Sequence, residues 1–312
     1  MAANVLADSA PFVVTNQNPF VSAHGLGRDL GTQLAEPGQL RWSAAYSVAS
    51  QFEIADRGAE RITIDGESAR TELRLFWGVA PGWELGIEVP YMAHDGGFLD
   101  DLIIDWHDWF NLPQNGRDLA ARDVLRFSYI GPTDALLLNR DVSGLGDVQL
   151  FAARQLQTSD HASTVLRAHL KLPTGDADDL LGSGSLDGGV SVHHQRRLND
   201  WLSLGGWLGA SYLGDGDILP GRSRSVVAQG GLRTAVMVND RVTLKVQWDV
   251  HSQVYKDTRL QQLNEVAYLL SLGGTLRFNP RHALDIVVVE NYPHPQISPD
   301  VAFQLHWRWM PD

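Results

Sequence analysis

Charged side chains recur at alternate positions in several segments, and alternate residues of a β-strand project from the same face. By this parity one face carries nine basic and seven acidic residues: Arg41, Arg70, Arg74, Arg167, Lys171, Arg233, Lys245, Arg277 and Arg308, with Glu53, Glu72, Glu84, Glu88, Asp147, Asp249 and Asp285. His169 shares that face. Such a set could line a charged pore or form ion pairs that fill a narrow interior. The near balance favours the ion pairs, because a strongly selective pore usually carries rings of one sign.

The histidines and serines do not form a recognisable catalytic set. His251 and Ser252 are adjacent, so in a strand they point to opposite faces and cannot act as a nucleophile and its base. The run Gly182-Ser183-Gly184-Ser185 has the wrong register for a Gly-x-Ser-x-Gly motif. His169 and His251 could share the interior with Asp249, but no nucleophile is evident at matching depth. The sequence therefore predicts no catalytic residue and no cofactor.

Metal ligands are equally sparse. His193 and His194 are neighbours in a strand and cannot bind one ion together. Asp176, Asp178 and Asp179 lie in a glycine-rich loop, but the EF-hand spacing and its terminal Glu are missing, which makes calcium binding there a minor alternative. The chain has no cysteine, which excludes disulfides and thiol chemistry. No metal site is predicted.

The elements that carry these residues have the pattern of long β-strands. Leu244, Val246 and Trp248, for example, alternate with Lys245 and Gln247, and about twelve comparable runs follow one another from residue 40 onward. Most are ~10 residues or longer, whereas strands of soluble proteins average ~5–6. No run of ~18 apolar residues occurs, which excludes a transmembrane helix.

The connections alternate between short and long. The short ones are Pro81-Gly82, Asn199-Asp200, Asn239-Asp240 and Asn279-Pro280, and the long polar ones are 93–143, 174–187, 214–222 and 255–265. Tight turns at one end and long loops at the other are typical of outer-membrane barrels. Trp and Tyr residues also cluster towards strand ends, as an interfacial girdle requires. We therefore predict an all-β fold: a transmembrane antiparallel up-and-down barrel of about twelve strands over residues 38–312. The first and last strands pair, and both termini are periplasmic.

The first 37 residues precede the barrel and lack its alternation. They are too apolar for a disordered tail, so we expect either a plug inserted from the periplasmic end or a short periplasmic strap. The residues assigned to the plug are Asn16, Gln17, Asn18, Pro19 and Phe20.

The extracellular loop 93–143 contains the one helical pattern in the chain. Apolar residues fall at helical spacings, with aspartates largely on the other faces; the apolar set is Leu99, Leu102, Ile103, Trp106, Trp109 and Phe110. We expect this short amphipathic helix to fold over or into the barrel mouth, as a gate or a platform for an apolar ligand. The alternative is a loop that packs on its neighbours.

Three short motifs resemble an uncharacterised family of bacterial outer-membrane proteins, the domain of unknown function 3187. They are Asn16-Gln17-Asn18-Pro19-Phe20, Gly144-Leu145-Gly146-Asp147-Val148 and Leu172-Pro173-Thr174-Gly175. The last two are also similar to motifs of barrels associated with uptake of aromatic compounds. The resemblance implies an outer-membrane barrel, and the family carries no established activity to transfer.

Composition limits the partners. A net charge of −12 and a pI near 5.3 argue against nucleic-acid binding, which needs clustered basic residues. The start Met1-Ala2-Ala3-Asn4 lacks a signal peptide, so we expect a mature form in the outer membrane. The predicted function is a channel for passive uptake of a small, partly apolar solute, in contact with outer-membrane lipid and lipopolysaccharide. The alternatives are a non-transporting structural or accessory subunit and, with less support, a lipid-modifying hydrolase; a partner protein is left open.

Overall fold

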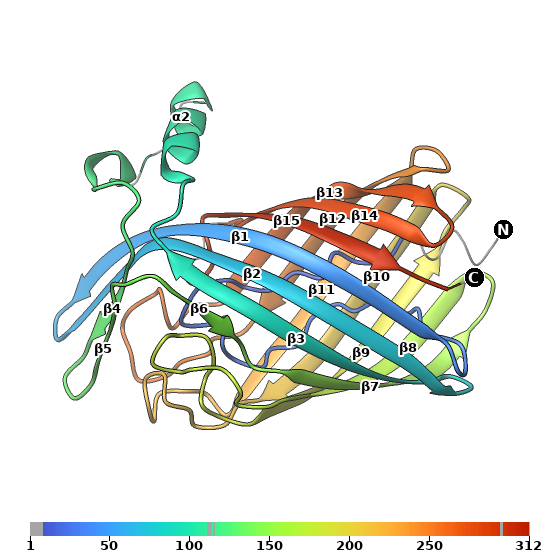
Figure 1. The fold of residues 1–312 in the computed structure, drawn as a ribbon, viewed down its shortest axis with the longest axis horizontal. Coiled ribbons are helices and arrows are strands. Elements are labelled where there is room, and N and C mark those ends of the chain that lie inside the picture. The colour runs from blue at the N-terminus through green and yellow to red at the C-terminus, as the bar shows by residue number, and fades with distance from the viewer. Residues whose placement is uncertain (1–8, 111–113, 115, 294–295, 312) are drawn as a thin grey trace.

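The computed structural model describes residues 9–110, 114, 116–293 and 296–311. Twelve long antiparallel strands form a closed barrel (Figure 1). They are β1 (Leu40–Arg57), β2 (Glu60–Ala80), β3 (Trp83–Asp95), β7 (Gln149–Thr158), β8 (Ala162–Lys171), β9 (Asp187–Arg197), β10 (Leu202–Tyr212), β11 (Val226–Met237), β12 (Val242–His251), β13 (Ala267–Asn279), β14 (His282–Glu290) and β15 (Val301–Trp309).

The barrel closes between its first and last strands, as predicted. β1 pairs with β15 from Trp42↔Trp309 to Ser50↔Val301, and on its other edge β1 pairs with β2. The turns between β2 and β3 and between later strand pairs lie at the end of the barrel where β1 begins and β15 ends (Figure 1). We call this the periplasmic end and the opposite end extracellular.

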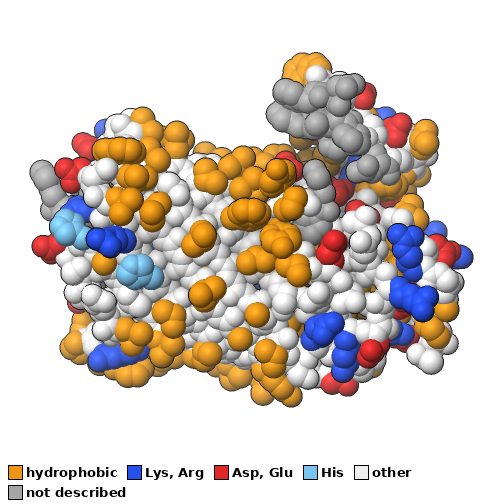
Figure 2. Space-filling model, turned by 180° about the vertical axis from the view of Figure 1, so that it is seen from behind, with side chains coloured by type: hydrophobic (Ala, Val, Ile, Leu, Met, Phe, Trp, Pro, Cys, Tyr) orange, Lys and Arg blue, Asp and Glu red, His pale blue; other side chains and the backbone are white. Residues whose placement is uncertain are grey.

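Side chains alternate between an apolar exterior and a polar interior. On β12, Leu244, Val246 and Trp248 are 54%, 49% and 45% exposed, whereas Lys245 and Gln247 are buried. Apolar side chains cover the wall between two more highly charged ends (Figure 2). This is the reverse of a soluble protein, and it suits lipid because a closed barrel satisfies every wall backbone group internally. Of the described helices, none is long and apolar enough to cross a membrane.

Aromatic side chains gather at the periplasmic end. Trp42 stacks on Trp309 with ring centroids 6.3 Å apart, and Phe278 stacks on Trp307 at 5.2 Å. The amphipathic indole rings of the three tryptophans favour the boundary between lipid and water.

The long loop after β3 is more structured than the sequence predicts. It contains a helix, α2 (Asp100–Phe110), a 3-10 turn, η1 (Arg117–Leu119), and three short strands, β4 (Arg126–Ile130), β5 (Ala135–Leu138) and β6 (Val142–Leu145). β4 pairs with the first residues of β2, which extends the sheet beyond the barrel wall. Ile62 and Ile64 continue the inward face of β2 that carries Glu72 and Arg74, and they are fully buried. The polar interior pattern of the wall therefore ends here, which is why the sequence does not predict this extension.

Candidate functional site in the barrel lumen

The sixteen residues assigned to the lumen all lie on inward-facing positions, but not at one depth. Twelve are buried: Arg70, Glu72, Arg74, Glu84, Glu88, Arg167, Lys171, Arg233, Lys245, Asp249, Asp285 and Arg308. Arg41 and His169 are half-buried. Glu53 lies at the extracellular mouth, where the side chain of Gln262 donates to it at 3.0 Å, and Arg277 is half-buried beside the periplasmic turn after β13.

Residues 9–37 run inside the barrel as a hairpin, here called the N-terminal hairpin (Figure 1). On its ascending arm, Phe12 exchanges two hydrogen bonds with the side chain of Gln247, at 2.9 and 2.8 Å. Four residues further on, the amide of Asn16 lies 3.0 Å from the His251 ring. Since β12 runs from its periplasmic turn towards the extracellular end, these contacts show that the arm rises through the lumen.

The hairpin turns near Phe20 and descends. The Tyr255 hydroxyl donates to the Phe20 carbonyl at 2.5 Å, and the Gly25 amide donates to Asp187 at 2.7 Å. Close to the periplasmic end, the Ala35 amide donates to Glu84 at 2.8 Å. Gly25 is required here, because a Cβ at this position would lie 2.7 Å from the Asp187 Cβ.

A charged cluster joins the descending arm to β2 and β3. Arg28 bonds Glu72 and Glu88 at 2.7 Å each. The same two carboxylates also accept from the wall: Arg70 bonds Glu72 at 2.6 Å, and Arg74 bonds Glu88 at 2.5 Å and Glu72 as well. All five side chains are buried. Two wall carboxylates are thus shared by two wall arginines and one hairpin arginine.

The next residue binds the opposite side of the lumen. Asp29 pairs with Arg233 on β11 and lies 3.0 Å from the His193 ring nitrogen on β9. Adjacent residues of an extended chain point in opposite directions, so Arg28 and Asp29 brace the hairpin between two walls. Neither residue is predicted from the sequence as part of the site. Two adjacent, oppositely charged residues in the otherwise apolar N-terminal segment are the signal that could have identified them.

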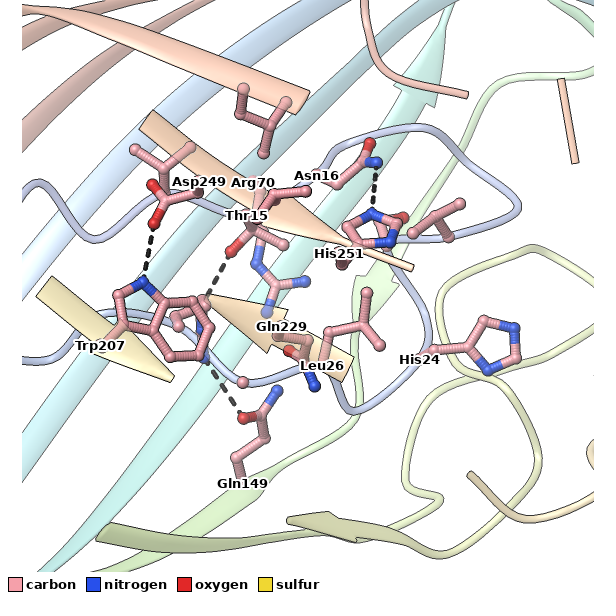
Figure 3. Close-up of a pocket in the computed structure, with 17 residues that line it drawn as sticks. Thr15, Asn16, His24, Leu26, Arg70, Gln149, Trp207, Gln229, Asp249 and His251 are labelled. Atoms are coloured by element: carbon pink, nitrogen blue, oxygen red, sulfur yellow. Dashed lines mark hydrogen bonds between the residues drawn. The ribbon is translucent and has the colours of Figure 1, made fainter. Parts of the chain in front are cut away.

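Little space is left between hairpin and wall. The internal cavity in Figure 3 has a volume of about 40 Å³. It is bordered by Asn16 and His251 and by Trp207, whose ring N–H donates to Asp249 at 2.8 Å. That volume is far below the ~300–1,000 Å³ of small-molecule sites, so the space can hold water but no organic solute. Among the described residues, the hairpin therefore leaves no room for a solute at mid-height.

A hydrophobic cluster closes the extracellular end. It combines the hairpin tip with side chains from β2, β4 and several loops, and its most buried members include Phe20, Val21, Ile62, Ile64, Phe127, Tyr129, Leu180, Ile218, Tyr255, Leu260, Leu263 and Ile297. We call it the extracellular cap. All five residues assigned to the plug are buried here or just below, with Asn16 and Asn18 accepting backbone bonds that shape the tip.

Helix α2 does not lie where the sequence analysis expects it. Leu99 and Ile103 pack against Val48, which pairs with the outward-facing Phe303. The helix therefore sits on the outer wall and not across the mouth, because its buried side complements an apolar strip of β1. Leu102 and Trp109 are 54% and 85% exposed. The side chains of Trp106 and Phe110 fall outside the described residues.

The two histidines considered for catalysis, His169 and His251, have different partners. His169 contacts the Gly25 carbonyl at 2.9 Å, while His251 contacts Asn16 and its own strand end. The sequence analysis misses one serine–lysine contact: the Ser183 hydroxyl lies 2.5 Å from the Lys171 ammonium. Lys171 also bonds Asp147 at 2.5 Å, so this is an ion-pair cluster that fixes the loop after β8 to the wall. No group of three or more metal-ligating side chains occurs among the described residues.

Comparison with known proteins agrees with this architecture. The family model described as "Protein of unknown function (DUF3187)" matches residues 2–309. No curated protein matches. Among solved structures, the COG4313 outer membrane channel from Pseudomonas putida F1 is similar over 88% of this chain and 97% of its own, with 13% identity and a TM-score of 0.56.

Two other solved barrels are more distant. The NanC porin is 12% identical over 88% of this chain and all of its own, with a TM-score of 0.49. The toluene transporter TodX of Pseudomonas putida is 10% identical over 95% of this chain and 98% of its own, with a TM-score of 0.43. At such identities, the similarity to the COG4313 channel shows a shared fold, that of a porin-like outer-membrane barrel.

Proposed function

The chain belongs to this family of unknown function, and we propose that it is an outer-membrane channel for a small, partly apolar solute, closed by its N-terminal hairpin. The single observation that supports this role is the way the hairpin fills the lumen. Hydrogen bonds and ion pairs join the hairpin to residues of the barrel wall. Those wall residues also have charged partners on neighbouring strands. The apolar outer wall would contact membrane lipid and, in the outer leaflet, lipopolysaccharide, and no catalytic step is assigned to any residue.

The wall can keep its main carboxylates paired without the hairpin. If Arg28 leaves, Glu72 and Glu88 still bond Arg70 and Arg74. Glu84 likewise retains Arg41, at 2.7 Å. A buried ion pair gives little net stabilisation relative to the hydrated groups, so water that replaces the hairpin recovers much of what the lost bonds supplied. Departure of the hairpin would leave a hydrated polar channel.

A structural role without transport is the second candidate, and the extracellular cap favours it. The cap is a packed hydrophobic cluster that includes the hairpin tip, and it would have to loosen before any solute could enter from outside. A barrel whose job is purely structural could keep such a cap closed permanently.

Conductance in planar lipid bilayers distinguishes the two candidates. The test compares the full chain, a variant lacking residues 2–37, and the full-length double variant Arg28→Gln/Asp29→Asn. We expect low, intermittent conductance from the full chain, frequent openings from the double variant and steady conductance from the deletion. Heat-modifiable gel migration verifies that each barrel is folded. A folded deletion variant that still does not conduct would contradict the channel and support the structural role.

A further inference from the structure

A large cavity opens at the periplasmic end, between the two arms of the hairpin and the surrounding strands β1, β2, β7, β8, β9 and β15. Its volume is about 500 Å³, within the range of small-molecule sites. We call it the vestibule. It lies below the closed part of the lumen, so a ligand could occupy it while the hairpin remains in place.

One buried nitrogen atom of a side chain that lines the vestibule, Nη1 of Arg74, has no hydrogen-bond partner within the described part of the chain. Arg74 is only 2% exposed. Buried polar groups are nearly always satisfied, and an unsatisfied N–H of a charged group is costly. This atom therefore points to a ligand that accepts a hydrogen bond.

The strand register places a second arginine beside the first. Ser43 on β1 is directly opposite Arg74 on β2 and directly opposite Arg308 on β15. Neighbouring strands are ~4.8 Å apart, so the two arginine backbones flank Ser43 at a separation of roughly 10 Å. A carboxylate above Ser43 would lie within reach of both guanidinium groups, which suit the planar geometry of that anion.

Cationic side chains outnumber carboxylates around the vestibule. Among the described ion pairs of this half of the lumen, eight cations share five acids: Arg28, Arg41, Arg70, Arg74, Arg167, Arg233, Lys245 and Arg308 against Asp29, Glu72, Glu84, Glu88 and Asp285. Among the described lining residues, Glu36 is the one carboxylate, and it is exposed at the rim. Such a site attracts anions and repels cations.

The rest of the lining is mixed: neutral polar side chains such as Gln155, Ser163 and Gln195 lie on one part of it, and apolar side chains on another. Val13, Leu30 and Leu34 of the hairpin face the cavity, together with Phe76, whose ring lies 4.0 Å below the Arg41 guanidinium. We propose that the vestibule binds an amphipathic organic carboxylate, with its anionic group between Arg74 and Arg308 and its apolar body against Phe76 and the hairpin. The site uses residues of the closed barrel, so its occupancy does not depend on conduction.

Isothermal titration calorimetry on the detergent-solubilised full chain at low ionic strength tests this assignment with benzoate as the probe. Benzamide has nearly the same shape without the charge, and inorganic phosphate has charge without the apolar body. We expect benzoate to bind one per chain and at least about tenfold more tightly than either control, since one charge-assisted hydrogen bond corresponds to about that factor. Binding should weaken as salt is added.

Two substitutions at one position provide the matched variants. Ser43→Asp places a carboxylate permanently between the two arginines, so benzoate binding should be lost while the thermal unfolding midpoint rises. Ser43→Asn is similar in size but neutral and should bind benzoate within about threefold of the original chain. Equal affinities for benzoate and benzamide, or undiminished binding by a folded Ser43→Asp variant, would overturn the assignment. Equal affinities for phosphate and benzoate would overturn the organic nature of the ligand.

Discussion

The assignment of lipid-facing positions predicts a depth-dependent cost for a charge on the outer wall. Val246 is 49% exposed and lies on β12 between Leu244 and Trp248. It is four residues above Val242 at the periplasmic start of the strand. With a rise of ~3.3 Å per residue and a tilt of ~40°, it sits roughly 10 Å into an apolar band ~25 Å tall, close to the midplane.

Val246→Arg should therefore destabilise the barrel by about 2–4 kcal/mol. Val238, 57% exposed at the periplasmic turn after β11, provides the matched control on the same face of the wall. Val238→Arg should cost only about 0–1 kcal/mol, because the arginine reaches the interface. The measurement is reversible denaturant unfolding of the barrel in lipid vesicles. Equal costs at the two positions, or no cost at either, would show that the faces or the bilayer position are wrong.

Two further outcomes are expected in the extracellular loops. Replacing residues 98–110 by a Gly/Ser linker should leave bilayer conductance unchanged, because α2 packs on the outer wall. An increase in conductance would show that the helix restricts passage through the barrel. Arg222 bonds both oxygens of Asp134, at 2.9 and 3.1 Å, and this hydrogen bonding lowers the Asp134 pKa below its ordinary 3.8. The pair should therefore stabilise the β4–β5 hairpin fully above about pH 4 and progressively less as pH falls. Hydrogen-exchange protection of residues 131–138, corrected for the intrinsic pH dependence of amide exchange, should fall on acidification in the original chain, whereas Asp134→Asn should remove that dependence.

The barrel wall could be predicted from sequence because one physical rule governs it. Every wall residue faces either lipid or the lumen, so polarity alternates with period two wherever both environments persist. Leu244 to Trp248 illustrate this, and the closing pair of β1 and β15 follows from an even strand number. The rule ends beyond the barrel wall: Ile62 and Ile64 lie on the inward face of β2, yet they are apolar and fully buried.

The contents of the lumen could be predicted only in part. Parity identifies Glu72 and Glu88 as inward-facing. Their shared ion pairs join β2 and β3, which are consecutive in sequence and adjacent in the barrel, with Arg74 directly opposite Glu88. It cannot identify Arg28, because the hairpin has no regular period and its position depends on contacts to residues far along the chain. The placement of α2 fails for a related reason, since an amphipathic helix fits an apolar strip outside the barrel as well as one at its mouth. Gln247 is a further case: parity places its side chain in the lumen but cannot predict its hydrogen bonds to Phe12.

The two ends of the barrel are joined by one segment. The hairpin tip is part of the extracellular cap through Phe20, and its arms line the vestibule through Val13 and Leu30. An element that contacts both ends couples them, because movement at one end changes the free energy of contacts at the other. A solute that separates the outer loops would loosen the Tyr255–Phe20 bond that holds the tip. An anion in the vestibule would stabilise the arms in place. We therefore expect vestibule ligands to favour the closed state and solutes at the cap to favour the open one. The two classes of ligand should then weaken each other's binding by the same factor.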